Sequence, residues 1–114
     1  MIINIKATGM DITPAIRKYA EEKVEGLTKY FNNITQADID VGLKSHHHLK
    51  GKIYYAEFNI HVPGKMVRVS KNSEDLYKAI DKVKDHLKVE LEKMKEKMRA
   101  KDKKVLREQK GYKE

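Results

Sequence analysis

A long amphipathic stretch near the end of the chain, residues 73–110, constrains the fold more than any other feature of the sequence. Its apolar residues recur at the spacing of one face of an α-helix: Leu76, Ile80, Val83, Leu87, Leu91, Met94 and Met98. Asn72 or Ser73 can cap the start of this helix, and neither Gly nor Pro interrupts it before Gly111. Such an apolar stripe needs a second apolar surface, which the rest of the chain must supply.

The rest of the chain predicts four strands and a further helix. Residues 3–8, 37–43, 54–62 and 65–70 alternate apolar with polar side chains, the period of a strand with one buried face. Thr13 and Pro14 mark a helix start, and apolar residues then follow at helical spacing to Phe31. The polar residues 44–52 predict a loop, and Pro63-Gly64 predicts a turn.

These elements predict an α+β fold of order β-α-β-β-β-α. We expect a four-stranded mixed sheet, with a parallel first pair and antiparallel later pairs, and two helices packed on one face. A helix of about 35 residues is roughly 50 Å long, whereas strands of about eight residues span roughly 27 Å. We therefore expect residues 1–98 to form the domain and residues 99–114 to form a basic helix extension that overhangs it and ends in a flexible tail.

The charge balance of the chain points to an anionic partner. The sequence has 25 Lys and Arg against 17 Asp and Glu, a formal net charge of +8, which suits nucleic acid or another polyanion. The chain has no cysteine, which excludes disulfides and thiolate metal sites. Nothing in it resembles a signal peptide or a membrane span, so we expect a cytoplasmic location.

Three segments of the chain carry a family resemblance: DITPAIRKYAEEKVEGLTKYF over residues 11–31, the Pro-Gly hairpin, and SEDLYKAIDKVKDHLKVELEK over residues 73–93. They resemble the ribosome hibernation promoting factor family, which is sigma-54 modulation protein-like and includes the ribosome-associated inhibitor proteins. The resemblance covers residues 1–98, either as a short form or as an N-terminal domain. The fold of that family has the element order predicted above.

The resemblance implies a non-enzymatic protein that binds the small ribosomal subunit between its head and body. There it would occupy the mRNA path and the aminoacyl and peptidyl tRNA positions, so that translation is blocked. Idle ribosomes would be preserved under stress, often as dimers. The implied partner is rRNA of the small subunit, with no cofactor, small-molecule substrate or membrane.

In this family, basic residues along both helices contact rRNA. The matching positions in this chain are Arg17, Lys23, Lys29, Lys93 and Lys97. The chain departs from the family at three positions that commonly hold Lys or Arg: Gly26, His86 and Val89. We hypothesise that nearby lysines replace these contacts, namely Lys82, Lys84 and Lys88, and we include Lys82 and Lys88 in the expected rRNA-binding set. The cations of the two helices are expected to form one contiguous docking face.

The adjacent histidines and the tyrosines are two further groups of candidate binding residues. His46, His47 and His48 are adjacent, and adjacent strand residues point to opposite faces, so we expect a polar hairpin tip and no metal site. Tyr54 and Tyr77 are expected in the core. Tyr55 lies on the open sheet face, where acidic residues such as Asp38 and Asp40 would repel RNA, so the helices are the expected contact surface.

Other classes of function stay open to different degrees. Charge alone also fits a general RNA-binding module or an ordinary solvated helix surface. The stripe from Leu76 to Met98 approximates heptads, so a coiled coil or a membrane-surface amphipathic protein without ribosome specificity is an alternative. An enzyme is not expected, because the sequence has no Gly-rich phosphate loop, no H-E-x-x-H or G-x-S-x-G motif, and no paired acidic residues around a plausible pocket.

Overall fold

The computed structural model describes residues 1–47 and 51–112, with side chains for residues 1–44 and 51–100. The elements follow the predicted order: β1 (Ile2–Thr8), α1 (Pro14–Leu27), β2 (Gln36–His47), β3 (Gly51–Val62), β4 (Lys65–Ser73) and α2 (Leu76–Tyr112). The strands form one sheet in the order β1-β2-β3-β4. Because β1 and β2 pair in parallel and the two later pairs are antiparallel, the mixed sheet predicted from the sequence is confirmed.

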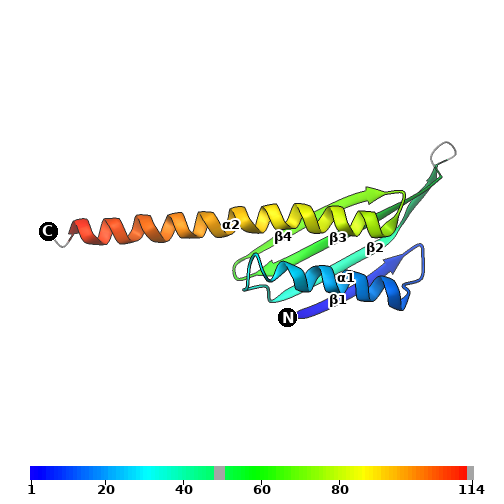
Figure 1. Cartoon of the computed structure of the whole chain (residues 1–114), viewed down its shortest axis with the longest axis horizontal. Helices are drawn as coiled ribbons and strands as arrows, with labels where there is room; N and C mark the ends of the chain where they lie inside the picture. The colour runs from blue at the N-terminus through cyan, green and yellow to red at the C-terminus, as the bar shows by residue number, and fades with distance from the viewer. Residues whose placement is uncertain (48–50, 113–114) are drawn as a thin grey trace.

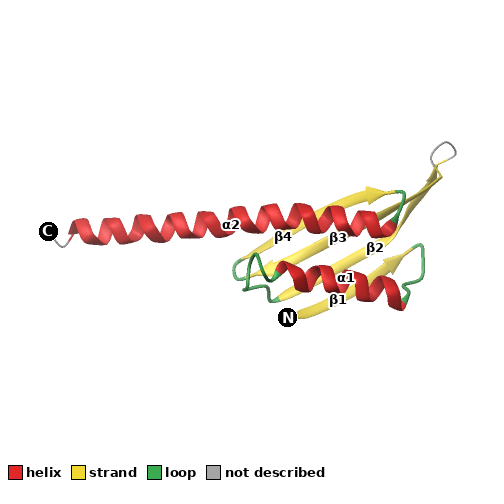
Figure 2. Ribbon diagram, viewed as in Figure 1, coloured by secondary structure: helices red, strands yellow, loops and turns green. Residues whose placement is uncertain are grey.

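Both helices lie on the same face of the sheet and run side by side (Figures 1 and 2). The largest fully buried side chains come from the strands and helices that meet there, and include Phe58, Ile60, Leu27, Leu87 and Leu91. Along β3, burial alternates residue by residue from Ala56 to Val62, as expected for a strand with one face against the helices. The other face of the sheet stays open.

The apolar stripe of α2 packs into this core, but its buried part ends one stripe position, or four residues, earlier than predicted. Leu76 through Met94 are buried at every stripe position, whereas the side chain of Met98 is 45% exposed. Met94 and Met98 lie beside the β3–β4 turn, where they line a surface hollow with Val62 and Pro63. Beyond this turn, α2 leaves the sheet and has no apolar surface beneath it.

Helix α1 is shorter than the prediction, which extended it to Phe31. It starts as expected, with the Thr13 hydroxyl accepting from the backbone N–H of Ile16 and Pro14 in the first turn. It ends at Leu27, because the following N–H groups close a tight turn: Thr28 donates to the carbonyl of Glu25, and Tyr30 to that of Leu27. Phe31, which follows this turn, is still buried in the core. The apolar spacing therefore extends beyond the end of the helix.

The loop predicted over residues 44–52 is wrong, apart from residues 48–50, which lie outside the described residues. Strand β2 continues to His47 and β3 begins at Gly51, and the two remain paired, with a register shift between Leu43 and Ser45. Antiparallel backbone pairing needs no apolar side chains, so polar residues continued the ribbon where the hydrophobic pattern stopped. The prediction of a polar tip at His46, His47 and His48 falls on side chains outside the described ones.

The second helix also begins and ends differently from the prediction. Strand β4 extends to Ser73, and the cap of α2 is neither Asn72 nor Ser73: the backbone N–H of Tyr77 donates to Asp75 Oδ1 over 2.9 Å. The helix continues to Tyr112, past Gly111. It overhangs the sheet at the end opposite the β2–β3 ribbon (Figure 1), and the molecule measures 70 × 29 × 19 Å.

Candidate nucleic-acid interface

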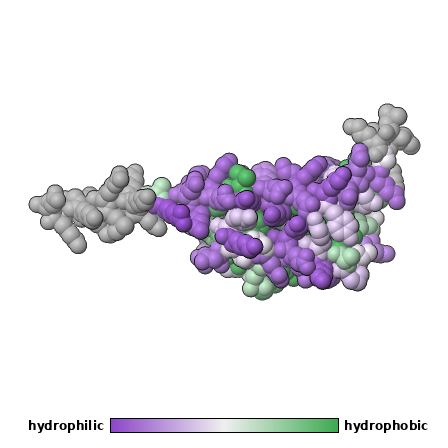
Figure 3. All heavy atoms as spheres, viewed as in Figure 1, coloured by the Kyte–Doolittle hydropathy of each residue, from purple (hydrophilic) through white to green (hydrophobic). Residues whose placement is uncertain are grey.

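The predicted rRNA-binding side chains all belong to the helix layer. Arg17 and Lys23 lie on α1, Lys29 lies in the turn that follows it, and Lys82, Lys88, Lys93 and Lys97 lie on α2. Seen from the helix side, hydrophilic residues cover most of α1 and of the part of α2 whose side chains are described (Figure 3). Two of these cations, Lys23 and Lys88, make contacts that join α2 to α1 or to the turn after it.

A cluster of four side chains joins α1 to α2. Tyr19 of α1 donates its hydroxyl to Asp81 Oδ1 of α2 over 2.6 Å, and Lys23 Nζ lies 3.4 Å from the same oxygen. The ammonium of Lys23 also sits over the ring of Tyr19, 4.9 Å from its centroid, and the ring of Tyr77 meets that of Tyr19 edge-on at 4.9 Å. Because Asp81 holds both side chains of α1, Lys23 is fixed in the space between the helices.

The cluster changes the acid–base properties of its members. The hydrogen bond to Asp81, then burial, raises the pKa of the Tyr19 hydroxyl. Partial burial by itself would lower the pKa of Lys23, but attraction to the Asp81 carboxylate and the Tyr19 hydroxyl more than offsets it and raises that pKa. Lys23 is therefore a permanent cation near neutral pH, and Asp81 partly neutralises its field.

Lys88 is the second predicted cation between the helices. Its Nζ lies 5.1 Å from the centroid of the Tyr30 ring, in the turn after α1. Lys23 and Lys88 are thus both held against tyrosine rings that belong to α1 or its following turn. A cation over an aromatic face keeps its charge and its exposed donors, so both lysines remain available to an anion.

The other predicted cations have separate contacts or are exposed, Lys29 among the exposed ones. Lys82 Nζ donates to the backbone carbonyl of Asn72 at the end of β4 over 3.4 Å, and Lys93 Nζ lies 3.9 Å from Glu90. Lys97 borders the hollow beside the β3–β4 turn, and Arg17 is exposed on α1. The seven cations share the helix layer, and the single contiguous docking face stays a prediction.

The three positions that depart from the family pattern are open positions on the helices. A Cβ built at Gly26 meets nothing within 4 Å, Val89 is 46% exposed, and His86 lies 3.4 Å from Glu90 one turn further on. A long cationic side chain at any of them would reach solvent. The replacement of these contacts by Lys82, Lys84 and Lys88 stays a prediction, although Lys82 is directed to β4 and Lys88 to Tyr30.

The position of Tyr77 was not predicted correctly from the sequence. It was expected in the core beside the stripe, but its side chain is 38% exposed and packs on Tyr19. Tyr54 is half-buried and packs against the core, as expected. The sequence feature that could have indicated this contact is Asp81, one turn after Tyr77. A carboxylate that faces a neighbouring helix needs hydrogen-bond donors from that helix.

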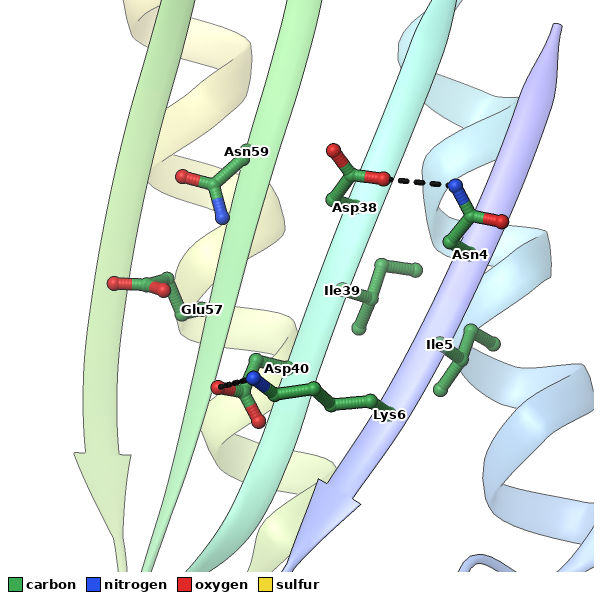
Figure 4. A pocket seen from close by; sticks show the side chains of 8 residues that line it. All are labelled: Asn4, Ile5, Lys6, Asp38, Ile39, Asp40, Glu57 and Asn59. Atoms are coloured by element: carbon green, nitrogen blue, oxygen red, sulfur yellow. Dashed lines mark hydrogen bonds and ion pairs between the residues drawn. The ribbon is translucent and has the colours of Figure 1, made fainter.

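The open face of the sheet has the opposite chemistry. Asp38 accepts hydrogen bonds from Asn4 and Gln36 and lies 2.8 Å from His61 Nε2, and these bonds lower the pKa of its carboxyl group. Beside it, Asp40 pairs with Lys6 at 3.8 Å, and Figure 4 shows Asn4 and Lys6 of β1 reaching toward these carboxylates of β2. The shallow hollow there measures about 290 Å³.

The polar side chains of this open face satisfy one another. Tyr55 donates its hydroxyl to Asp40 over 2.9 Å, and burial, more than this bond, raises its pKa. Arg68 donates to Asn59 and lies 4.0 Å from Glu57. With three carboxylates and its tyrosine already bonded, this face is a poor surface for RNA, in keeping with the sequence-based expectation.

The described residues offer neither a metal site nor a membrane-spanning helix. No group of three or more His, Asp or Glu able to hold a metal ion occurs among the residues that the structure describes. Within that same part of the chain, none of the helices combines the length and apolar character needed to cross a membrane.

Comparison with known proteins gives a consistent result. The family model described as "Sigma 54 modulation protein / S30EA ribosomal protein" matches residues 3–99. The ribosome hibernation promoting factor of Azotobacter vinelandii is 38% identical over 97 residues, which cover 85% of each chain. The ribosome hibernation promotion factor of Bacillus subtilis is 31% identical over 89% of this chain, but this match spans only 52% of that longer protein.

Solved structures agree with the sequence comparison. The N-terminal domain of Thermus thermophilus Protein Y superposes with a TM-score of 0.72 at 33% identity, covering 82% of this chain and 99% of that domain. A ribosomal subunit interface protein from Coxiella burnetii gives a TM-score of 0.73 at 25% identity, covering 83% and 98%. With its matching fold, the chain belongs to the sigma 54 modulation protein / S30EA ribosomal protein family, whose named relatives include ribosome hibernation factors.

Proposed function

We propose that this protein is a non-enzymatic ribosome hibernation factor that binds the small ribosomal subunit through its helix layer. In this proposal it occupies the mRNA path and the aminoacyl and peptidyl tRNA positions, and so keeps idle ribosomes out of translation. The observation that carries the proposal is the arrangement of cations over two adjacent helices, on one face of a fold shared with named hibernation factors.

The physical basis of binding is contact with phosphates. Lysine and arginine side chains on the helix layer are spaced along two nearly side-by-side axes, so they can meet phosphates of more than one RNA strand. Contacts of this kind position a protein without reading base sequence. Selectivity for the small subunit then comes from shape: a body of 70 × 29 × 19 Å fits a long groove better than an isolated duplex.

The distribution of charge supports docking by the helices in preference to the sheet. Lys23 and Lys88 are pre-positioned against tyrosine rings, so little side-chain freedom is lost when they bind. The open sheet face presents Asp38, Asp40 and Glu57 and would be turned away from rRNA. Inhibition follows from occupancy, because mRNA and tRNA cannot enter a channel that already holds the protein.

The membrane-surface and coiled-coil alternatives lose their main support. Both need the apolar face of α2, and that face is buried against the sheet from Leu76 to Met94. Among described residues of α2, the large apolar side chains left at the surface are Tyr77, Val89 and Met98, which are well separated along the helix. A general RNA-binding module remains the second candidate, since the same cations would serve it.

Sedimentation with purified ribosomes tests the proposal. Wild-type protein should travel with the small subunit, and excess tRNA and mRNA together should release it. The double variant Lys23→Gln/Lys88→Gln should lose binding, whereas Lys6→Gln/Lys44→Gln, which removes the same charge from the strands, should keep it. Equal loss in both variants would favour general charge attraction, and binding unaffected by tRNA and mRNA would overturn the channel position. The same gradients report whether ribosome dimers form.

A further inference from the structure

A hollow of about 400 Å³ opens where the two helices begin. Its lining comes from the segment before α1, from α1, from β3 and from the start of α2: Met10, Ile16, Tyr54, Glu74, Asp75, Leu76 and Tyr77. Green and pale atoms interrupt the purple surface at this end of the helix layer (Figure 3). None of the lining residues belongs to the phosphate contacts proposed above, and nothing in the proposed function uses the hollow itself.

The wall formed by Tyr77 is rigid although it is exposed. Its ring meets the ring of Tyr19 at 85°, with centroids 4.9 Å apart, and Tyr19 is itself held by its 2.6 Å hydrogen bond to Asp81. The backbone of Tyr77 is fixed as well, because its N–H donates to the capping carboxylate of Asp75. An exposed aromatic side chain that is held in place is a preformed surface for a flat ligand.

The residues that line the hollow favour a flat ring with N–H donors over a phosphate. The lining combines the apolar side chains of Met10, Ile16 and Leu76 with the tyrosines Tyr54 and Tyr77 and the two acidic residues Glu74 and Asp75. Of the two acidic residues, Asp75 accepts from the backbone N–H of Tyr77, whereas Glu74 is exposed and forms no ion pair within the described part of the chain. A phosphate would be repelled there, whereas a flat ring with N–H donors on its edge matches both the tyrosines and the carboxylate of Glu74.

The lining of the hollow holds no cation, and the charge that a nucleic-acid strand needs comes from cations outside it, above all Lys23. Lys23 lies over the ring of Tyr19, which meets the ring of Tyr77, while Arg17 and Lys78 adjoin the lining residues Ile16 and Tyr77 in the sequence only. A strand can therefore place a phosphate on Lys23 while one of its bases turns into the hollow. Single-stranded RNA combines these two features, since its bases are free to leave the stack.

We propose that this hollow binds one unstacked nucleobase of single-stranded RNA, stacked on Tyr77, with guanine preferred. Guanine presents two adjacent N–H donors on its pairing edge, and the carboxylate of Glu74 can accept both. Uracil presents one N–H between two carbonyl groups, which the carboxylate repels. The inference rests on the proposed function and adds to it a base-specific contact within otherwise sequence-independent binding.

Three end-labelled RNA octamers test the site by fluorescence anisotropy at low salt: octauridine, octauridine with one central guanosine, and octauridine with one central abasic nucleotide. Wild-type protein should bind the guanosine octamer most tightly and the abasic octamer most weakly. The variant Tyr77→Ala should lose about five- to hundredfold in affinity for the guanosine octamer and should bind all three alike. Tyr77→Phe keeps the ring and should retain the wild-type order.

Two further variants sharpen the outcome. Glu74→Gln should remove only the preference for guanosine over uridine, and Met98→Ala, an exposed side chain of α2 outside the hollow, should change nothing. Thermal melting of each variant shows that it is folded. Equal binding of the three octamers by wild-type protein, no binding of any of them, or a retained order in Tyr77→Ala would overturn the base site. Ribosome co-sedimentation judges the proposed function separately, because a protein without a base site would still co-sediment.

Discussion

Asp81 of α2 makes the polar contacts that connect α2 to α1. Its carboxylate accepts from Tyr19 and pairs with Lys23, so it connects the helices and also competes with RNA for Lys23. We predict that Asp81→Asn lowers the free energy of unfolding by about 0.5–1 kcal/mol, because the side chain is partly exposed and the pair is weakened by water. RNA should bind more tightly to this variant, since an unfavourable charge is gone. Urea unfolding and ribosome binding measure the two effects.

The matched control for this prediction is Asp85→Asn. Asp85 lies one turn further along α2, is exposed, and pairs with Lys84 at 3.9 Å without joining the helices. It should gain some RNA affinity from the lost charge but lose less stability. Equal destabilisation by both substitutions would contradict the role assigned to Asp81.

Lys88 and Val89 test whether neighbouring lysines replace the missing family contacts. If Lys88 acts as a phosphate contact, Lys88→Ala should weaken small-subunit binding by about tenfold, a loss of roughly 1.4 kcal/mol. If the contact at residue 89 is already replaced, Val89→Arg should add little affinity. No loss in the first variant together with a gain in the second would show that no replacement exists. Equilibrium binding to labelled small subunits provides the measurement.

The contribution of Asp38, on the open sheet face, to the stability of the fold should depend on pH. Its pKa is lowered in the folded state by the hydrogen bonds from Asn4, Gln36 and His61, so its carboxylate stabilises the fold above its unfolded pKa of about 3.9. This stabilisation is lost as the pH falls through the folded pKa. Asp38→Asn should therefore be less stable than wild type near neutral pH, and the gap should narrow under acidic conditions. Melting temperatures across an acid series would reveal a constant gap if this is wrong.

Residues whose position follows from the periodicity of their own helix were predicted correctly, whereas those whose position depends on the neighbouring helix were not. The buried stripe residues Ile80, Leu87 and Leu91 were predictable because burial follows from helical periodicity. The exposure of Tyr77 and the positions of Lys23 and Lys88 depend on the neighbouring helix. No local pattern encodes which flank of one helix faces another, so these contacts between the helices could not be predicted from periodicity alone.

At the scale of elements, α2 should divide into a part that stabilises the fold and a part that does not. Leu91 is fully buried against the sheet, and Leu91→Ala should cost about 2–5 kcal/mol through the cavity it leaves. Met98, two turns further along, is 45% exposed, and Met98→Ala should cost less than about 0.5 kcal/mol. Denaturant unfolding compares the two, and similar losses would place the end of the core further along α2.

The limits of the elements were harder to predict than their existence. The strands and helices were all found because apolar spacing identifies them. The end of α1 at Leu27 and the continuation of β2 to His47 depend on backbone hydrogen bonds, which apolar spacing does not record. The cap at Asp75 was missed for a related reason: β4 kept its pairing as far as Ser73 and moved the helix start forward.

At the scale of the whole molecule, the separation of charge between the two faces predicts a strong dependence of binding on salt. If about six phosphates are contacted, log affinity should fall against log salt with a slope of roughly −4 to −5. Removing one helix-layer cation, as in Lys93→Gln, should reduce the steepness by about one unit, while Lys6→Gln on the open face should leave it unchanged. Titrations from low to physiological salt test this, and a flat response would contradict electrostatic docking.

The length of α2 beyond the sheet has a kinetic consequence. Extents of 70 × 29 × 19 Å describe a rod, and a rod can thread a confined passage only when its long axis is aligned with it. Most collisions would then be unproductive, and arrival would be slow compared with that of a globular protein of equal mass. Departure demands the same alignment in reverse, so a slowly formed complex would also be a long-lived one.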